Sequence, residues 1–316
     1  MTTFDTESTA EEVLAGQDLT GLTVFITGAN SGLGQETARA MAAHGAHVVM
    51  AGRDQDKLDD AVSAIRAEQP DAQLDTIVCD LGDLESIRAD TSRARQRFNK
   101  IDILINNAGV MASPFLHTAD GFELQFGTNH LGHFALTAEL MPLIERGTAK
   151  RIVNLSSRGH HMAPIDLDDP NFTEREYDPW TSYGQSKTAN ILFTVGLEER
   201  FATKDIHAYA VHPGGIQTNL GRHMTEEMVA DLMERVTTSD TSFAWKTIPQ
   251  GAATSCWAAT APELEGKGGL YCEDCHVAKI DDESASGGVR SYALDPVAAE
   301  RLWTLSEQLT GAQYPT

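Results

Sequence analysis

Short, almost continuous apolar runs alternate with amphipathic stretches over the first two thirds of this 316-residue sequence. The runs are rich in Val, Ile and Leu, as buried parallel strands are, and the stretches between them have the apolar spacing of helices. Strands joined by helices pair in parallel through right-handed crossovers. The sequence therefore predicts an α/β fold, a single doubly wound parallel sheet of about seven strands with helices on both faces. We expect strands at 22–27, 47–51, 75–79, 101–106, 151–156 and 206–212, and helices at 35–44, 57–68, 84–98, 122–145 and 182–201.

The pattern is looser after residue 215, where we expect helices at 225–236, 249–261 and 296–309 and a short strand at 269–272. We interpret this part as the completion of the same domain, so that 19–316 forms one unit preceded by a short arm at 1–18. The segments near 158–182 and 219–250, the second of which includes the expected helix at 225–236, are expected to form substrate loops over the site. Residues 281–288 are expected to form an exposed loop.

Charge and cysteine usage limit the compartment and the partners. The formal net charge of −22 excludes nucleic acid and an anionic membrane surface as expected partners, because both need a cationic footprint. The four cysteines are too few and too irregular for a secreted disulfide framework, and the first residues resemble no signal peptide. We therefore expect a cytoplasmic protein.

A glycine-rich stretch follows the first expected strand and opens the first expected helix. It reads Thr27-Gly28-Ala29-Asn30-Ser31-Gly32-Leu33-Gly34. Glycines let the backbone turn tightly and approach a pyrophosphate, whose charge the free N–H groups of a helix start can bind. The spacing G-x-x-x-G-x-G is by itself also compatible with a plain strand–helix turn. Its place in the first strand–helix unit favours a Rossmann-type dinucleotide site made by Gly28, Asn30, Ser31, Gly32, Leu33 and Gly34.

The end of the second expected strand indicates which dinucleotide binds. An NAD enzyme places a carboxylate there for the ribose 2′-hydroxyl, but this chain has Gly52 followed by Arg53. A guanidinium is a bidentate partner for a 2′-phosphate, so we expect NADP(H) in preference to NAD(H). The alternative is a solvated Arg53 paired with Asp54.

Two further strand ends complete the expected cofactor site. Ligands of such sheets collect at the carboxyl ends of the strands. Asp80, next to Leu81, ends the third strand and could accept a hydrogen bond from an adenine amino group. Asn107, Ala108 and Gly109 end the fourth strand and offer a wall of small residues for a flat ring.

A phenol and an ammonium stand four residues apart in Tyr183-Gly184-Gln185-Ser186-Lys187. On a helix, positions i and i+4 share one face, so the two head groups can converge. A cation ~4 Å from the phenol is worth roughly 4 kcal/mol at an effective dielectric near ~20, or about three pKa units. We expect Lys187 to bring the pKa of Tyr183 near neutrality, which would make the phenol an acid and base for an alcohol or carbonyl.

These stretches together resemble the short-chain dehydrogenase/reductase family. The resemblance covers roughly residues 19–310 and is closest to the group of retinol dehydrogenases and the WW-domain-containing oxidoreductase. It is carried by TGANSGLG, NNAG, TNHLGHF, VNLSSRGHH, YGQSKTANILF, AVHPGG and PELEGKGGLY. The membrane-bound members of this group have an apolar anchor, and we expect neither that anchor nor a preceding WW domain in this protein.

The resemblance implies a catalytic tetrad of Asn129, Ser157, Tyr183 and Lys187. Tyr183 would exchange a proton with the substrate oxygen, Ser157 would stabilise charge on that oxygen, and Lys187 would also bind the nicotinamide ribose. Asn129 would hold a water that links Lys187 to solvent. Pro213, Gly214, Ile216 and Thr218 would cover the nicotinamide amide and the phosphates.

The two loop segments indicate a small hydrophobic alcohol or carbonyl compound as the substrate. They contribute Met162, Phe172, Tyr177, Trp180, Met224, Met228, Phe243 and Trp245. Two other functions are compatible with the motifs: reduction of a carbon–carbon double bond, as in protochlorophyllide reductase, and non-catalytic sensing of NADP. A homodimer through the helices near residues 122 and 182 is also expected, unless the C-terminal segment covers that surface.

Two patterns resemble metal or haem sites without being interpreted as such. Cys272-Glu273-Asp274-Cys275-His276 matches a haem-attachment pattern, but that chemistry belongs to exported proteins and one such pair falls short of four zinc ligands. His130 and His133 have an i, i+3 spacing that could suit a metal, and we interpret them as helix packing. No metal is expected.

Overall fold

The structure, a computed structural model, describes residues 4–222, 224–239 and 244–315. Within these residues one sheet has eight strands in the order β3-β2-β1-β4-β5-β6-β7-β8. All neighbours pair in parallel except β7 and β8, which are antiparallel. The strands are β1 (Thr23–Thr27), β2 (His47–Gly52), β3 (Leu74–Val78), β4 (Ile103–Asn106), β5 (Arg151–Leu155), β6 (His207–His212), β7 (Leu270–Glu273) and β8 (His276–Val277).

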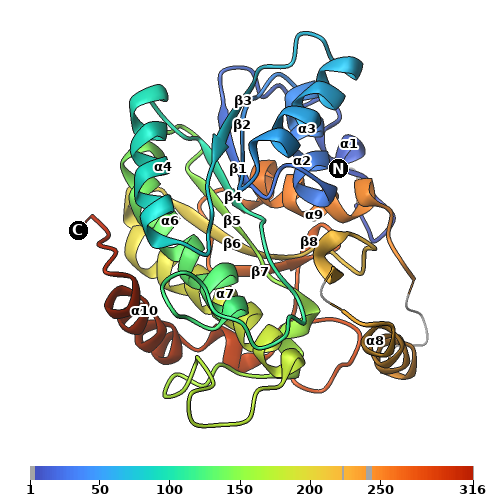
Figure 1. The fold of residues 1–316 in the computed structure, drawn as a ribbon. Coiled ribbons are helices and arrows are strands. Elements are labelled where there is room, and N and C mark those ends of the chain that lie inside the picture. Colours follow the sequence, from blue (N-terminus) through green and yellow to red (C-terminus); the bar gives the residue numbers. More distant parts are fainter. Residues whose placement is uncertain (1–3, 223, 240–243, 316) are drawn as a thin grey trace.

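Helices cover both faces of this sheet (Figure 1). One face carries α1 (Ala10–Leu14), α2 (Gly32–Ala43), α3 (Gln55–Glu68) and α9 (Ile248–Thr260). The other carries α4 (Leu84–Arg97), α6 (Gly132–Ile144), α7 (Pro179–Phe201) and α10 (Pro296–Thr310). The helix α8 (Glu226–Ser239) stands apart from both layers in Figure 1. Across the described residues, no helix has both the length and the apolar character needed to span a bilayer.

The central strands are apolar throughout because both of their faces are buried. Val24 and Ile26 on β1 point into the core on the side of α2 and α9, whereas Phe25 between them points into the core on the side of α4 and α6. Alternate residues of a strand face opposite sides of a sheet, so two helical layers need an unbroken apolar strand. This explains the near-continuous runs in the sequence, and the α/β prediction is confirmed.

The sheet has one short strand in addition to the seven that were expected, because the two-residue strand β8 pairs back onto β7. Asp274 and Cys275 connect β7 to β8 with φ values of 45° and 57°. Two successive residues with positive φ make the tight turn that matches the twist of a hairpin. Nothing in the sequence had marked this hairpin, because neither residue is a glycine.

The expected helix at 122–145 is divided in the structure. It consists of α5 (Leu124–Phe126), a π-helical turn over Gly127–Leu131, and α6. The Gly132 N–H bonds to the Gly127 carbonyl oxygen, five residues back. Such π-turns widen a helix locally and often occur at functional sites.

The segment 4–18, expected as an arm, contains α1, which packs against α9 and α2. Ala10 and Leu14 on this helix are fully buried, and Thr9 and Glu12 form a capping box at its start. The remaining short helical turns are Arg158–Met162, Ala202–Lys204, Asn219–Gly221, Pro262–Leu264 and Ser291–Leu294.

Candidate active site

A cavity of about 1670 Å³ opens at the carboxyl ends of the parallel strands. It contains residues that follow β1, β2, β3, β4, β5 and β6, which the crossovers bring to one edge of the sheet. Most of the site residues expected from the sequence line this one cavity. They are Gly28, Asn30, Ser31, Gly32, Leu33, Arg53, Asp80, Leu81, Asn107, Ala108, Gly109, Ser157, Tyr183, Lys187, Pro213, Gly214, Ile216 and Thr218.

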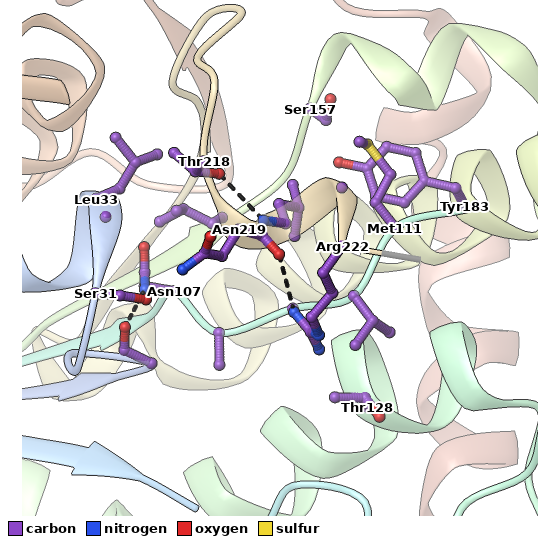
Figure 2. A pocket seen from close by; sticks show the side chains of 18 of the residues that line it. Ser31, Leu33, Asn107, Met111, Thr128, Ser157, Tyr183, Thr218, Asn219 and Arg222 are labelled. Atoms are coloured by element: carbon purple, nitrogen blue, oxygen red, sulfur yellow. Dashed lines mark hydrogen bonds between the residues drawn. The ribbon is translucent and has the colours of Figure 1, made fainter. Parts of the chain in front are cut away.

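The cavity has two ends, with the segment after β6 between them. Figure 2 shows the glycine-loop residues and Asn107 at one end and the catalytic candidates at the other. Ser31 and Leu33 belong to the first end, and Ser157, Tyr183 and Met111 to the second. Thr218, Asn219 and Arg222 lie between them, so this segment is placed to contact a ligand that reaches from one end to the other.

The glycine loop has the backbone geometry that its sequence predicts. Gly28 and Gly32 have φ values of 65° and 56°, a region that favours glycine. A Cβ at Gly28 would lie 2.9 Å from the Ala108 Cα, and one at Gly34 would lie 2.4 Å from the Gly28 carbonyl oxygen. Gly34 therefore lies where α2 closely approaches the glycine loop, and it is not part of the cavity wall.

The N-terminus of α2 faces the cavity. Ser31 occupies the N-cap with no capping hydrogen bond from its side chain, and Ser31, Gly32 and Leu33 all line the cavity. Backbone N–H groups and the helix dipole make this end of a helix favourable for a phosphate. The donor set at this end therefore fits a pyrophosphate.

The residues that follow the second strand line the cavity. Asp54 caps α3 through a 3.2 Å hydrogen bond from Lys57 N, and its carboxylate pairs with the Lys57 ammonium at 3.0 Å. Asp54 is thus engaged by Lys57, and both line the cavity together with Arg53 and Asp60. The alternative of an Arg53–Asp54 pair is not what the structure shows.

The catalytic candidates come from β5 and α7. Ser157 follows β5 and accepts a 3.0 Å hydrogen bond from Gly159 N. Tyr183 and Lys187 lie one turn apart on α7 and are 4% and 3% exposed. A Cβ at Gly159 would lie 2.6 Å from Cε1 of Tyr183, so this glycine lets the ring pack against the turn after Ser157. No sequence pattern indicates this role of Gly159.

The expectation for the pKa of Tyr183 was wrong in this structure. Burial raises the pKa of Tyr183 to about 12, and the side chain of Ser157 opposes that rise only in part. Burial also lowers the pKa of Lys187 to about 8. Removal from water penalises the charged form of each group and is the largest cause of both shifts in pKa. In the structure without a bound cofactor, Tyr183 is therefore a protonated phenol at neutral pH.

Asn129 lies behind the cavity wall rather than on it. Its Nδ2 donates to the Val110 carbonyl oxygen at 2.9 Å and to Ser186 Oγ at 2.9 Å, while its Oδ1 accepts from Val110 N at 2.8 Å. Both amide hydrogens are therefore used by protein groups. The Asn129 side chain thus fixes the backbone beside the site, and the expectation that Asn129 holds a water linking Lys187 to solvent stays a prediction.

The loop residues expected to contact a substrate divide into two sets. Met162, Trp180, Met224 and Trp245 line the cavity, and the sequence analysis missed Met111 and Leu220 beside them. Among the described residues, Phe172, Tyr177 and Met228 are not part of that lining. Tyr177 donates instead to the Ser113 carbonyl oxygen, and Phe172 packs under the Arg175 guanidinium. Phe243 lies outside the described residues, as do 223 and 240–242 of the same loop.

The loop at 281–288 forms part of the cavity edge. Ala285 lines the cavity, and two cavity-lining arginines hold the loop through its carbonyl oxygens. Arg290 donates to Asp281 O at 2.6 Å and to Ser284 O at 2.7 Å, and Arg158 donates to Ser286 O at 3.2 Å. Length and composition gave no signal for the Arg158 contact, because it joins residues that are 128 positions apart in the chain.

The histidines at positions 130 and 133 have separate partners, as expected for helix packing. His130 Nε2 lies 2.8 Å from Ser306 Oγ on α10, and His133 Nε2 lies 2.9 Å from Thr27 Oγ1 on β1. In the C-x-x-C-H stretch, Cys272 and Cys275 are buried and His276 is exposed.

Comparisons with known proteins agree with this geometry. The family model described as short chain dehydrogenase matches residues 22–229. The short-chain dehydrogenase/reductase prx1 of Penicillium roqueforti is 38% identical over 315 residues, which cover 96% of this chain and 90% of prx1. Retinol dehydrogenase 14 of Homo sapiens is 38% identical over 305 residues, or 92% of this chain and 87% of that protein. A crystal structure of an uncharacterised Mycobacterium paratuberculosis protein superposes with a TM-score of 0.74 at 36% identity, covering 96% of this chain and 98% of that one.

Proposed function

Because the chain belongs to the short-chain dehydrogenase family, we propose that it is an NADP(H)-dependent oxidoreductase that interconverts a hydrophobic alcohol and its aldehyde or ketone. The observation that supports this most directly is one shared cavity. The glycine loop, with Gly28 and Gly32, opens into the same space as Ser157, Tyr183 and Lys187. A dinucleotide in that space would bring its reactive ring to the buried phenol.

The preference for NADP(H) rests on the corner after β2. Gly52 leaves no carboxylate for a ribose 2′-hydroxyl, and Arg53 and Lys57 both line the cavity there. Guanidinium and ammonium groups favour a 2′-phosphate. In a chain with a formal charge of −22, the Arg53 guanidinium would also provide a local positive charge against the global repulsion of a polyanionic cofactor.

Tyr183 is proposed as the group that transfers the proton. When bound, NADPH supplies the hydride. Tyr183 is protonated near neutral pH because burial raises its pKa to about 12, and a protonated phenol is the form that a carbonyl reduction uses. Ser157 lies beside it and would donate to the same substrate oxygen as negative charge develops. Lys187 would stabilise the phenolate that remains.

The proposed substrate is hydrophobic because of the cavity wall around Tyr183. Met111, Met162, Trp180, Leu220 and Met224 contribute thioether, aromatic and aliphatic surface. Pockets of this kind bind apolar bodies and use a few polar groups for orientation. Methionine adapts to several shapes, so we expect a range of apolar aldehydes and ketones rather than one.

The test is a turnover assay with purified protein, NADPH or NADH at matched concentrations, and a panel of carbonyl compounds. We expect consumption of NADPH with apolar aldehydes or ketones and a lower rate with NADH. Turnover only with conjugated carbon–carbon double bonds would instead support a reductase of the protochlorophyllide type. Tight binding of NADPH without turnover of any compound would support an NADP sensor and contradict the proposal.

A further inference from the structure

A buried histidine joins the first strand to the π-helical turn. His133 is 2% exposed and lies in the first turn of α6. Its Nε2 is 2.9 Å from Thr27 Oγ1, at the end of β1, and its Nδ1 is 2.9 Å from the Asn129 carbonyl oxygen in the π-turn. The ring thus spans two elements that meet behind the cavity.

The neighbouring groups determine which ring nitrogen carries the proton. Thr27 Oγ1 accepts hydrogen bonds from Asn107 N at 2.9 Å and Ala108 N at 3.0 Å. The Thr27 hydroxyl lies closer to Nε2 of His133, at 2.9 Å, than to its other acceptor, the Ile105 carbonyl oxygen at 3.5 Å, so its hydrogen is available for Nε2. A carbonyl oxygen can only accept, so Nδ1 must donate to Asn129 O. The ring is neutral with its proton on Nδ1, and burial, which lowers its pKa to about 4, keeps it neutral at physiological pH.

The chain of hydrogen bonds continues from Asn129 to the catalytic helix. Asn129 holds the Val110 backbone through two bonds and donates to Ser186 Oγ at 2.9 Å. Ser186 Oγ in turn donates to the Tyr183 carbonyl oxygen at 2.8 Å. The route Thr27–His133–Asn129–Ser186–Tyr183 is buried along its length and connects the end of β1 with α7.

We propose that His133 is a positioning residue, which holds Asn129 and thereby the Tyr183 and Lys187 segment of α7 in register with the end of β1. The inference rests on the proposed function, because it assigns His133 a task in that reaction. A neutral imidazole accepts a hydrogen bond at one ring nitrogen and donates one at the other. The Thr27 hydroxyl needs the acceptor, and the Asn129 carbonyl oxygen needs the donor. A phenyl ring would fill the same space but leave the Thr27 hydroxyl and the Asn129 carbonyl oxygen without this partner.

Three variants separate hydrogen bonding from packing. His133→Phe keeps a ring of similar size and removes both hydrogen bonds. His133→Asn keeps an N–H near the place of Nδ1 and can restore the bond to Asn129. His130→Phe is the matched control, since His130 is equally buried, lies three residues earlier, and bonds Ser306 on α10 instead.

We expect kcat for carbonyl reduction to fall about tenfold or more in His133→Phe, while the Kd of NADPH changes less than about threefold. His133→Asn should recover a substantial part of kcat, and His130→Phe should retain it. A folded His133→Phe with wild-type kcat overturns the inference, as does an Asn variant no better than Phe. A wild type that reduces no carbonyl compound overturns the proposed function itself, which is a separate result.

A measurement on the wild-type protein does not depend on any variant folding. Nitrogen-15 NMR of histidine-labelled protein distinguishes the two neutral tautomers and the cation. We expect one buried histidine, assigned by its loss in His133→Asn, to remain neutral and protonated on Nδ1 from about pH 6 to about pH 8. A proton on Nε2, or a cationic ring in that range, overturns the inference.

Discussion

The ammonium of Lys187 lies beside the ring of Tyr183, with Nζ 5.6 Å from the ring centre, and donates a 3.1 Å hydrogen bond to the Leu155 carbonyl oxygen. The end of β5 thus holds the cation against α7. Both side chains are buried, so removal from water opposes charge on each of them. Burial lowers the pKa of Lys187 to about 8, so its ammonium is charged at neutral pH but loses its proton when the pH rises only slightly.

The first prediction concerns the pH dependence of carbonyl reduction. Because burial lowers the pKa of Lys187 to about 8, the ammonium loses its proton as the pH rises through that value, and the developing phenolate loses its cation. We expect kcat/KM to be nearly flat below pH ~7.5 and to fall above pH ~8. A pH series of initial rates measures this. Lys187→Arg, which stays charged, should remove the decline, and an unchanged decline in that variant would contradict the assignment.

The second prediction concerns the proton donor. Tyr183→Phe removes only the phenolic oxygen, so the cavity keeps its shape while the substrate oxygen loses its acid. We expect kcat to fall at least about 10³-fold with the Kd of NADPH nearly unchanged. Single-turnover rates and fluorescence titration measure the two quantities.

Tyr209→Phe is the control for that substitution. It removes a buried phenolic oxygen that bonds the Leu264 carbonyl oxygen and does not line the cavity. It should retain activity. Substantial turnover by Tyr183→Phe would show that another group donates the proton.

Sequence patterns predicted the sheet and most of the cavity lining because both depend on local rules. The glycine spacing at 28–34 requires a particular backbone, and Tyr183 and Lys187 share a helix face wherever that helix packs. Contacts between distant segments had no such signal. The hydrogen bond of Arg158 to the 281–288 loop and the hydrogen bond between His133 and Thr27 depend on tertiary packing.

The protonation states of Tyr183 and Lys187 also could not be predicted from the sequence. The spacing of Tyr183 and Lys187 indicated attraction between a cation and a phenolate, but the extent of burial decides the outcome. With both groups less than 5% exposed, desolvation raises one pKa and lowers the other. The residue pair was therefore identified from the sequence, whereas its protonation state required the structure.

The third prediction concerns the choice of cofactor. Arg53→Gln removes the charge proposed to bind the 2′-phosphate and keeps a polar side chain. We expect KM for NADPH to rise about tenfold or more and KM for NADH to change little, because NADH lacks that phosphate. The difference in KM for NADPH between the wild type and Arg53→Gln should shrink at high salt, because screening already weakens the contact between Arg53 and the 2′-phosphate.

The control for Arg53 is Arg301→Gln, which removes a surface charge paired with Asp168 outside the cavity. It should leave both KM values unchanged. Equal losses for NADPH and NADH in Arg53→Gln would show that Arg53 binds a group common to the two cofactors, and the preference for NADP(H) would then need another source.

The fourth prediction concerns α10 and the expected homodimer. Trp303 on α10 is 3% exposed and packs edge-on against Phe134 of α6 at 5.0 Å, with the Arg200 guanidinium 4.1 Å from its ring. Tyr314 follows α10 and donates to the Phe134 carbonyl oxygen at 2.8 Å. The C-terminal segment thus covers the surface of α6 and α7 through which we expected a homodimer. We now expect a monomer, which light scattering after size exclusion would show.

Trp303→Ala tests how much the packing of the C-terminal segment against α6 and α7 contributes to the free energy of unfolding. The substitution leaves a cavity among Phe134, Phe193 and Tyr314, so we expect the free energy of unfolding to fall by about 3–5 kcal/mol. Urea denaturation measures the change, and Trp303→Phe, which keeps an aromatic ring, should cost less. Loss of the cover exposes apolar side chains of α6 and α7, so the variant should also self-associate with rising concentration. A wild type that is already dimeric and dissociates in Trp303→Ala would show that α10 forms the interface instead of covering it.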